Sequence, residues 1–415
     1  MADKLRWQQL DHRKLPALLL VSLCGLYGPA IANLLPSFVT AWIEHLGVSE
    51  SVAGDLATVN LLAHASGLTL SLWLVSRYSL PPILRCGLAL AVLGDGASVF
   101  APSVPFLAVA RVLAGLGLGL QFGVVINWIG RNENAVRGFA LFMMMQFVFA
   151  AACFFLIPLL APTFRSGSVY VVLLPLVVAA AMLAPLLGLN GGSRPLAADR
   201  LRSASARSLL GPLLLPRALS VLAFALFNVA AIGLWGYIER YGLALGLSTR
   251  MVAVSLSMSA LCGIPGGLVV FGLGRRLGRL APLLLGLATF ALPVGVFALK
   301  TVGAPLFFLG LALIGFAWNI AQPYLQDVQS SLDRSGRLPV LGMVVAAVAG
   351  AFGPALVGMV VDGQHYQLAF DIAVAILATS AGVAVFPAVL AERNERDANR
   401  AQNSGVLRVA GDALP

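Results

Sequence analysis

The amino-acid sequence predicts an all-α integral membrane protein with twelve transmembrane helices in two pseudo-symmetric six-helix bundles. Three observations predict this fold. The 415 residues are 59% hydrophobic and only 11% charged, whereas soluble globular proteins carry about 25% charged residues. The mean hydropathy is +0.92, and the charged residues lie in short clusters between long apolar segments. This distribution is typical of a membrane protein, so the net charge of +10 does not indicate nucleic-acid binding.

Each predicted helix is an apolar segment of roughly 20 residues, the length that crosses a bilayer. The first segment continues past Ala30-Ile31-Ala32, which resembles a signal-peptidase site, so we interpret it as a retained helix. The expected spans are 15–41, 52–75, 82–101, 105–129, 138–161, 168–189, 217–238, 250–273, 280–300, 304–326, 338–361 and 368–390.

A polar segment rich in glycine, serine, proline and arginine lies midway along the chain and predicts a linker. The sequences on its two sides resemble each other: Trp42-Ile43-Glu44 corresponds to Tyr237-Ile238-Glu239. Repeated halves are typical of secondary transporters, in which two bundles move about a site at their interface. We expect a cytoplasmic N-terminus (1–14), an N-terminal bundle (15–189), a cytoplasmic linker (190–216), a C-terminal bundle (217–391) and a disordered cytoplasmic tail (392–415).

The distribution of lysine and arginine predicts the orientation in the membrane. Of the 27 basic residues, 22 fall in segments on the side of the N-terminus, four fall on the opposite side, and Arg111 lies within a span. Cytoplasmic loops carry an excess of basic residues, so we expect both termini in the cytoplasm. Arginine outnumbers lysine by 24 to 3, which suggests a GC-rich bacterial genome and hence a bacterial inner membrane.

The predicted fourth helix contains a charged residue in otherwise apolar sequence, Arg111. Gly115, Gly119 and Gly123 follow at intervals of four, and in a helix they form a strip where a neighbouring helix can approach closely. An arginine is costly in lipid, so Arg111 is expected to face protein or water.

These features resemble the major facilitator superfamily over roughly residues 15–391. Arg111 with Gly115 and Gly119 resembles the arginine-glycine motif of that family's fourth helix. Arg276-Leu277-Gly278-Arg279 matches the basic half of its signature loop, although both copies of the loop lack the usual aspartate. Gly350-Ala351-Phe352-Gly353-Pro354 resembles the glycine-proline motif that antiporters carry in the fifth helix, but here it lies in the eleventh, so we infer no antiport from it. The resemblance implies that helices one, four, seven and ten line a central cavity.

Polar residues on these four helices are the candidates for solute binding. Asn319 and Gln322 are three residues apart and share a helix face. Amides, aromatic rings and one arginine suit a small organic solute, such as an organic or aromatic acid; hydrogen bonding between helices is the alternative role of each amide. The predicted substrate-binding residues are Tyr27, Asn33, Arg111, Gln121, Asn228, Trp235, Asn319 and Gln322.

Three acidic or basic residues lie more than five residues from either end of an expected span and are the candidates for proton coupling: Asp95, His64 and Arg111. Asp95 and Arg111 lie at a similar depth, about 9 Å below the same surface, so they can pair. Protonation of Asp95 would then free Arg111, whereas the alternative is a permanent structural ion pair. His64 is expected either to relay protons or to form a hydrogen bond with a neighbouring helix.

Charged residues in the cytoplasmic loops predict a gate. We hypothesise that acidic residues such as Glu133 and Asp327 face the basic loops and replace the missing aspartates, although solvated pairs contribute little energy. The predicted gating residues are Arg77, Glu133, Arg276, Arg279, Asp327, Gly350 and Pro354.

The sequence contains no phosphate-binding loop, zinc-type histidine pair or nucleophile elbow, so we expect no enzyme, no metal and no cofactor. We expect a secondary active transporter of a small organic solute that works by alternating access. Its other partners are protons or another coupling ion and the lipid bilayer, without nucleic acid, and it is expected to be a monomer. The alternatives are a drug or metabolite efflux antiporter and a non-transporting membrane sensor or scaffold.

Overall fold

The structure is a computed structural model that describes residues 14–75, 77–130, 135–164, 167–183, 213–274, 276–299, 302–333, 337–362 and 365–411. These residues form helices and connecting turns, with no β-strand among them. The first half contains α1 (Lys14–Gly25), α2 (Ala30–Asn33), α3 (Leu35–Leu46), α4 (Glu50–Leu74), α5 (Leu80–Val99), α6 (Val104–Gly130), α7 (Ala135–Phe164), α8 (Ser168–Val171) and α9 (Leu174–Leu183). The second contains α11 (Leu214–Ala244), α12 (Thr249–Leu273), α13 (Leu280–Phe297), α14 (Ala304–Leu332), α15 (Arg337–Ala351), α16 (Gly353–Val361) and α17 (Tyr366–Gly411).

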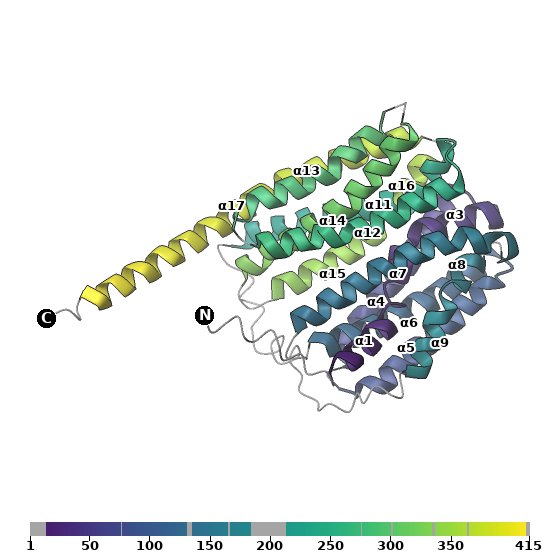
Figure 1. Cartoon of the computed structure of the whole chain (residues 1–415), viewed down its shortest axis with the longest axis horizontal. Helices are drawn as coiled ribbons and strands as arrows, with labels where there is room; N and C mark the ends of the chain where they lie inside the picture. The colour runs from purple at the N-terminus through teal and green to yellow at the C-terminus, as the bar shows by residue number, and fades with distance from the viewer. Residues whose placement is uncertain are drawn as a thin grey trace.

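The helices form two groups that lie side by side. Figure 1 shows α1 to α9, in purple to blue, on one side of the molecule and α11 to α17, in green to yellow, on the other. We call these groups the N-half and the C-half. Among the described residues, nine helices are long and apolar enough to cross a membrane. The other expected spans fall on α4 and on the short helices α1 to α3, α8 and α9, so the count of twelve stays a prediction.

The two halves repeat the same turn at matching positions. The helix before each turn ends at a glycine with positive φ, Gly47 at 63° and Gly246 at 79°, a backbone conformation that glycine adopts without steric cost. Two residues later a serine caps the next helix: the Ser49 hydroxyl accepts a hydrogen bond from the Val52 N–H, and Ser248 does the same for Met251. The repeat in the sequence therefore corresponds to a repeat in the structure.

The first expected span is broken into three helices, whereas its counterpart in the C-half, α11, is continuous over 31 residues. The first break follows Gly25 and contains Gly28-Pro29, and the second lies at Leu34, before Pro36. Proline lacks a backbone N–H and its ring clashes with the preceding turn, and together with the flexible Gly28 this favours a break at these positions. The break turns Ala32 and Asn33 toward the C-half, where they line the cavity described below.

The predicted glycine strip of α6 packs against α4. A Cβ atom on Gly115 would collide with the Asn60 carbonyl, and one on Gly119 would collide with the His64 carbonyl. At Gly123 the obstructing group is the Ser71 hydroxyl. Close approach of two helices gains dispersion energy without a driving force from water, which is how helices associate in lipid. The strip therefore fixes α6 closely against α4 between Asn60 and Ser71.

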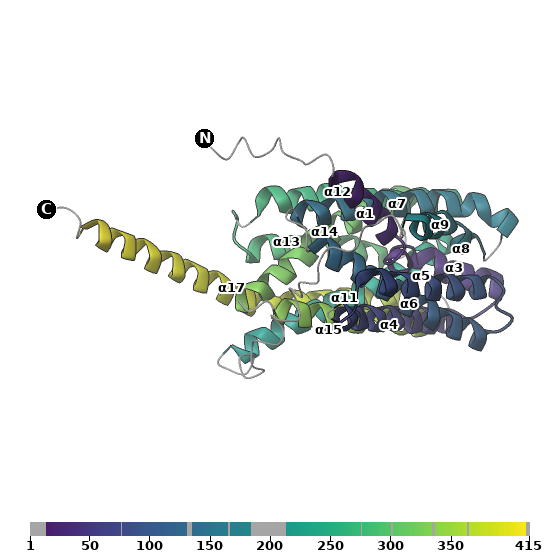
Figure 2. The same cartoon turned by 90° about the horizontal axis from the view of Figure 1, so that it is seen from below.

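The C-terminal tail differs from the expectation of disorder. Helix α17 continues to Gly411, and Figures 1 and 2 show its yellow end extending well beyond the bundle. The structure therefore describes residues 392–411 as helix, where the sequence predicts disorder. The physical reason is local: no glycine or proline interrupts 392–404, and Glu392 anchors the start of this segment to α13. Most of the expected linker (190–216) and of the N-terminus (1–14) lies outside the described residues.

Candidate functional site

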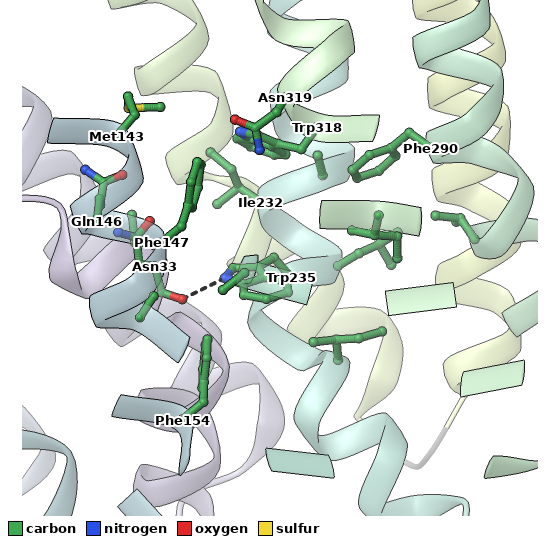
Figure 3. Close-up of a pocket in the computed structure, with 18 of the residues that line it drawn as sticks. Asn33, Met143, Gln146, Phe147, Phe154, Ile232, Trp235, Phe290, Trp318 and Asn319 are labelled. Carbon is green, nitrogen blue, oxygen red and sulfur yellow. Dashed lines mark hydrogen bonds between the residues drawn. The ribbon is translucent and has the colours of Figure 1, made fainter. Parts of the chain in front are cut away.

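A cavity of about 180 Å³ lies between the two halves. The N-half contributes residues of α2 and α7, and the C-half contributes residues of α11 to α14 and α17. Figure 3 shows these side chains converging from both sides. The lining residues are Ala32, Asn33, Met143, Gln146, Phe147, Ala150, Phe154, Ala231, Ile232, Leu234, Trp235, Ile238, Ala260, Phe290, Val294, Ile314, Trp318, Asn319 and Phe370.

Six of the nineteen lining residues are aromatic, and they come from both halves. Phe154 of the N-half meets Trp235 of the C-half edge to face, with ring centroids 6.0 Å apart. On the far side, the centroids of Phe290 and Trp318 are 6.3 Å apart. Because these rings come from both halves, a movement of one half against the other changes the shape of the cavity.

Three amide side chains supply the polar groups of the lining: Asn33, Gln146 and Asn319. The Asn33 Nδ2 atom is buried and has no hydrogen-bond partner among the described residues. Its backbone carbonyl accepts a bond of 3.2 Å from the Trp235 indole (Figure 3), so this amide is held beside the C-half. The Asn319 Nδ2 donates to the Gly315 carbonyl at 3.1 Å, which leaves its oxygen for other partners. Gln146 lies on α7, on the wall opposite Asn319.

The cavity contains three of the eight residues predicted to bind solute: Asn33, Trp235 and Asn319. The other five lie elsewhere. The Gln121 side chain donates to the Cys24 carbonyl of another helix, and the Asn228 side chain donates to the Phe224 carbonyl of its own helix at 2.9 Å. Both amides therefore form hydrogen bonds with the protein, which is the alternative role stated above. Gln322 is half-buried and outside the lining, and Tyr27 and Arg111 belong to a separate cluster.

Gln146, Phe147 and Phe154 line the cavity but were not among the residues predicted from the sequence. A signal was present, because the apolar span 138–161 contains one amide, Gln146, and no aspartate, glutamate, histidine, lysine or arginine. It was not used because the predicted fifth helix is not among the four that the resemblance places around the cavity.

Arg111 lies inside the N-half and is fully buried. Its Nη2 atom is 2.6 Å from Asp95 Oδ1, and its guanidinium also donates to the Ser98 hydroxyl and lies 4.9 Å from the centre of the Tyr170 ring. The Tyr27 hydroxyl donates to the other oxygen of Asp95. The predicted pairing of Asp95 with Arg111 is confirmed, and the arginine faces protein. None of these residues lines the cavity, so their predicted roles in solute binding and proton coupling stay predictions.

His64 lies between α4 and α6. Its ring centroid is 5.8 Å from that of Phe122, and its Nε2 atom is buried without a partner among the described residues. It does not line the cavity either. Its role in proton transfer also stays a prediction.

The halves are joined by polar contacts at one end of the helices, which we call the Glu50 end. Arg240 of the C-half binds Glu44 at 3.3 Å and Glu50 at 3.2 Å, both in the N-half. Ser37 donates to Glu239 at 2.7 Å. Burial raises the pKa of the Glu50 carboxyl above its usual range, although the charge of Arg240 acts in the opposite direction.

Helix α16 closes the same end by packing on α4. A Cβ on Gly54 would collide with the carbonyl of Pro354, and the Ala355 N–H donates to the Thr58 hydroxyl at 3.3 Å. The predicted gating residue Pro354 thus lies at the contact between the halves. Gly350 instead contacts Ile232 and Asn228 within the C-half.

At the opposite end, which we call the Arg279 end, the ionic contacts between described residues stay within the C-half. Arg279 Nε is 2.7 Å from Asp327 Oδ2, and Arg279 also binds Glu395. Glu392 accepts from the backbone N–H groups of Arg279 and Leu280 at 2.6 and 2.8 Å. Of the other predicted gating residues, Arg77 lies in the turn after α4, 4.3 Å from the ring centre of Trp73. Arg276 is exposed, and Glu133 lies outside the described residues.

Comparison with known proteins identifies the family. The model of the Major Facilitator Superfamily matches residues 20–354. The chain belongs to this superfamily. No curated protein sequence matches the chain.

Solved structures of major facilitator transporters share the fold. A D-xylose-proton symporter has a TM-score of 0.68 at 14% identity, covering 90% of this chain and 96% of that chain. The nucleoside transporter NupG has a TM-score of 0.67 at 14% identity, covering 89% and 98%. A bacterial homologue of the human drug peptide transporters has a TM-score of 0.67 at 13% identity, covering 92% and 98%. At these identities the likeness establishes the fold alone, and the superfamily supports a secondary transporter.

Proposed function

We propose that this protein moves a small organic solute across the membrane by alternating access. The main support is the cavity that both halves form. Arg240, Glu50 and helix α16 close the molecule at the Glu50 end. A binding site at the interface of two repeats is the arrangement on which alternating access depends. A scaffold would have no need of a cavity with amides in its wall, so the cavity favours transport over the non-transporting alternative.

Spin labels on both ends of the bundle test this proposal. One pair replaces Leu46 and Thr249 at the Glu50 end, and a second pair replaces Tyr78 and Leu277 at the Arg279 end; all four residues lie at the surface. Alternating access predicts two distance populations for each pair, with the two pairs changing in opposite directions. A single, invariant distribution at both ends would contradict the proposal and favour the scaffold.

The proposal includes coupling to protons and covers either direction of transport. A proton gradient across reconstituted vesicles is then expected to drive accumulation, and a protonophore to abolish it. Transport by Asp95→Asn and His64→Gln tests the two candidates inside the N-half, since normal pH dependence in a variant removes that residue from the mechanism. Glu239, which meets Ser37 between the halves, is a third candidate for the same measurement.

The proposal also places both termini in the cytoplasm, so that the Glu50 end faces outward. The excess of basic residues at the other end supports this orientation. A membrane-impermeant maleimide added to intact cells is expected to label a cysteine at Leu46 and not one at Tyr78. The reverse pattern would invert the topology.

A further inference from the structure

The described lining of the cavity contains no aspartate, glutamate, lysine, arginine or histidine. An ion that enters such a site loses water without gaining an opposite charge, which is unfavourable. Arg111, the cation expected to meet an acidic solute, is already bonded to Asp95 and lies outside the cavity. The chemistry of the wall therefore favours a solute without net charge.

The size and shape of the cavity restrict the solute further. Its volume of about 180 Å³ is below the roughly 300–1,000 Å³ of pockets that hold drug-sized ligands. Aromatic rings on opposite sides, Phe154 with Trp235 and Phe290 with Trp318, offer faces and edges for a planar ring. One ring or two fused rings fit this space better than a sugar, whose hydroxyl groups would face apolar walls.

Gln146 is the polar side chain best placed to recognise such a solute from the N-half. It is 6% exposed and lines the cavity, and its side-chain amide forms no hydrogen bond with the lining residues drawn in Figure 3. Buried amides are normally bonded, so a free one in a cavity points to a ligand or water as its partner. The amide offers both a donor and an acceptor, and the unbonded Nδ2 of Asn33 lies on the same half.

We propose that the cavity binds an uncharged aromatic compound of one or two rings, and that Gln146 selects it by bonding one amide, carbonyl or hydroxyl group on the ring. This inference rests on the proposed function, because it assigns the solute class to the same cavity. It differs from the organic acid that the sequence alone suggests.

Three probes of nearly equal shape test the charge preference: benzamide, benzoate and benzylamine, which at pH 7 are neutral, anionic and cationic. Binding is measured by thermal stabilisation of the full-length protein in detergent, and transport by counterflow of each labelled probe in vesicles. Benzamide is expected to bind about tenfold or more tightly than either ion, because only it avoids an uncompensated charge. Tighter binding of benzoate or benzylamine overturns the inference.

Substitutions of Gln146 test the residue itself. Gln146→Leu keeps the volume and removes the hydrogen bonds, so benzamide affinity is expected to fall about tenfold while a plain hydrocarbon such as toluene binds unchanged. Gln146→Glu is expected to shift the preference to benzylamine. The matched control is Gln326→Leu, which removes a half-buried amide of α14 outside the cavity and leaves benzamide binding unchanged.

The outcomes separate this inference from the proposed function. If Gln146→Leu binds benzamide as the wild type does, Gln146 is not the selecting residue. If none of the probes binds while the spin-label pairs still change in opposite directions, the solute class is wrong and alternating access stands. If the spin-label distances are invariant as well, the proposed function fails.

Discussion

Two arginines of this protein have opposite surroundings, and the difference separates structure from movement. Arg111 is fully buried and binds Asp95 within the N-half. Arg240 is partly exposed and binds Glu44 and Glu50 across the interface between the halves. A pair inside one half can persist while the halves move, whereas a pair between the halves must break whenever the Glu50 end opens. The second kind has to be weak, and partial exposure to water weakens it.

The surroundings of Arg111 also explain why this arginine lies away from the cavity. In lipid, a lone arginine is costly, so the fold surrounds Arg111 with Asp95, Ser98 and Tyr170. Its Nε and Nη2 donors are used in these contacts, its Nη1 has no partner among the described residues, and the guanidinium lies outside the lining of the cavity. Arg240 was not among the predicted site residues, because a basic residue near the end of a membrane helix is common.

The largest expected effect is on stability, from removal of the buried arginine. Arg111→Met leaves Asp95 buried without its partner, and breaking such a pair costs about 3–5 kcal/mol. Thermal unfolding in detergent is expected to show a large loss, and Arg240→Met, the control, a loss of about 1 kcal/mol or less. Equal losses in the two variants would contradict the distinction between the clusters.

The next effect is steric and acts on conformation. Gly54→Leu places a side chain where α4 meets the Pro354 carbonyl of α16, so the Glu50 end cannot close. The Leu46–Thr249 spin-label pair is expected to show the longer distance almost exclusively. Gly267→Leu is the control, because a Cβ at that position has open space around it; a closed population in Gly54→Leu as large as in the control would argue against closure at this contact.

A smaller shift is expected from loss of the bridging charge. Arg240→Gln removes the ion pairs with Glu44 and Glu50, which together are worth on the order of 1 kcal/mol at partial exposure. The open fraction at the Glu50 end is therefore expected to rise about fivefold in the same spin-label measurement. Lys in place of Arg240 retains the charge and is expected to restore most of the closed state.

The smallest expected effect is a dependence on pH. Because the pKa of Glu50 is raised in the closed state and is ordinary when water surrounds it, the closed state binds its proton more tightly. Acid therefore favours closure. This contribution is complete below the ordinary pKa of glutamate, about 4.3, and is lost as the pH rises through the raised value. Glu50→Gln is expected to abolish this dependence, and an unchanged pH profile would assign the effect to another group.

Local features of this molecule could be predicted from sequence because they depend on neighbours along the chain. The close packing at Gly115 follows from the glycine spacing in the sequence, whereas the span 15–41 was expected to be one helix and is broken at Gly28-Pro29. The pairing of Asp95 with Arg111 followed from their equal depth. The residues of the cavity were harder to predict from the sequence: Asn33, Trp235 and Asn319 were identified, and Gln146 was not.

The sequence by itself determined that this is a helical membrane protein with two related halves, because hydropathy, helix length and repetition are properties of the chain alone. Only the tertiary structure decided which polar side chains meet at the cavity. Helical periodicity places Gln146 and Arg111 each on one face of a helix, but it does not say which helix that face will contact. That contact directs Gln146 toward the cavity and encloses Arg111 within the N-half.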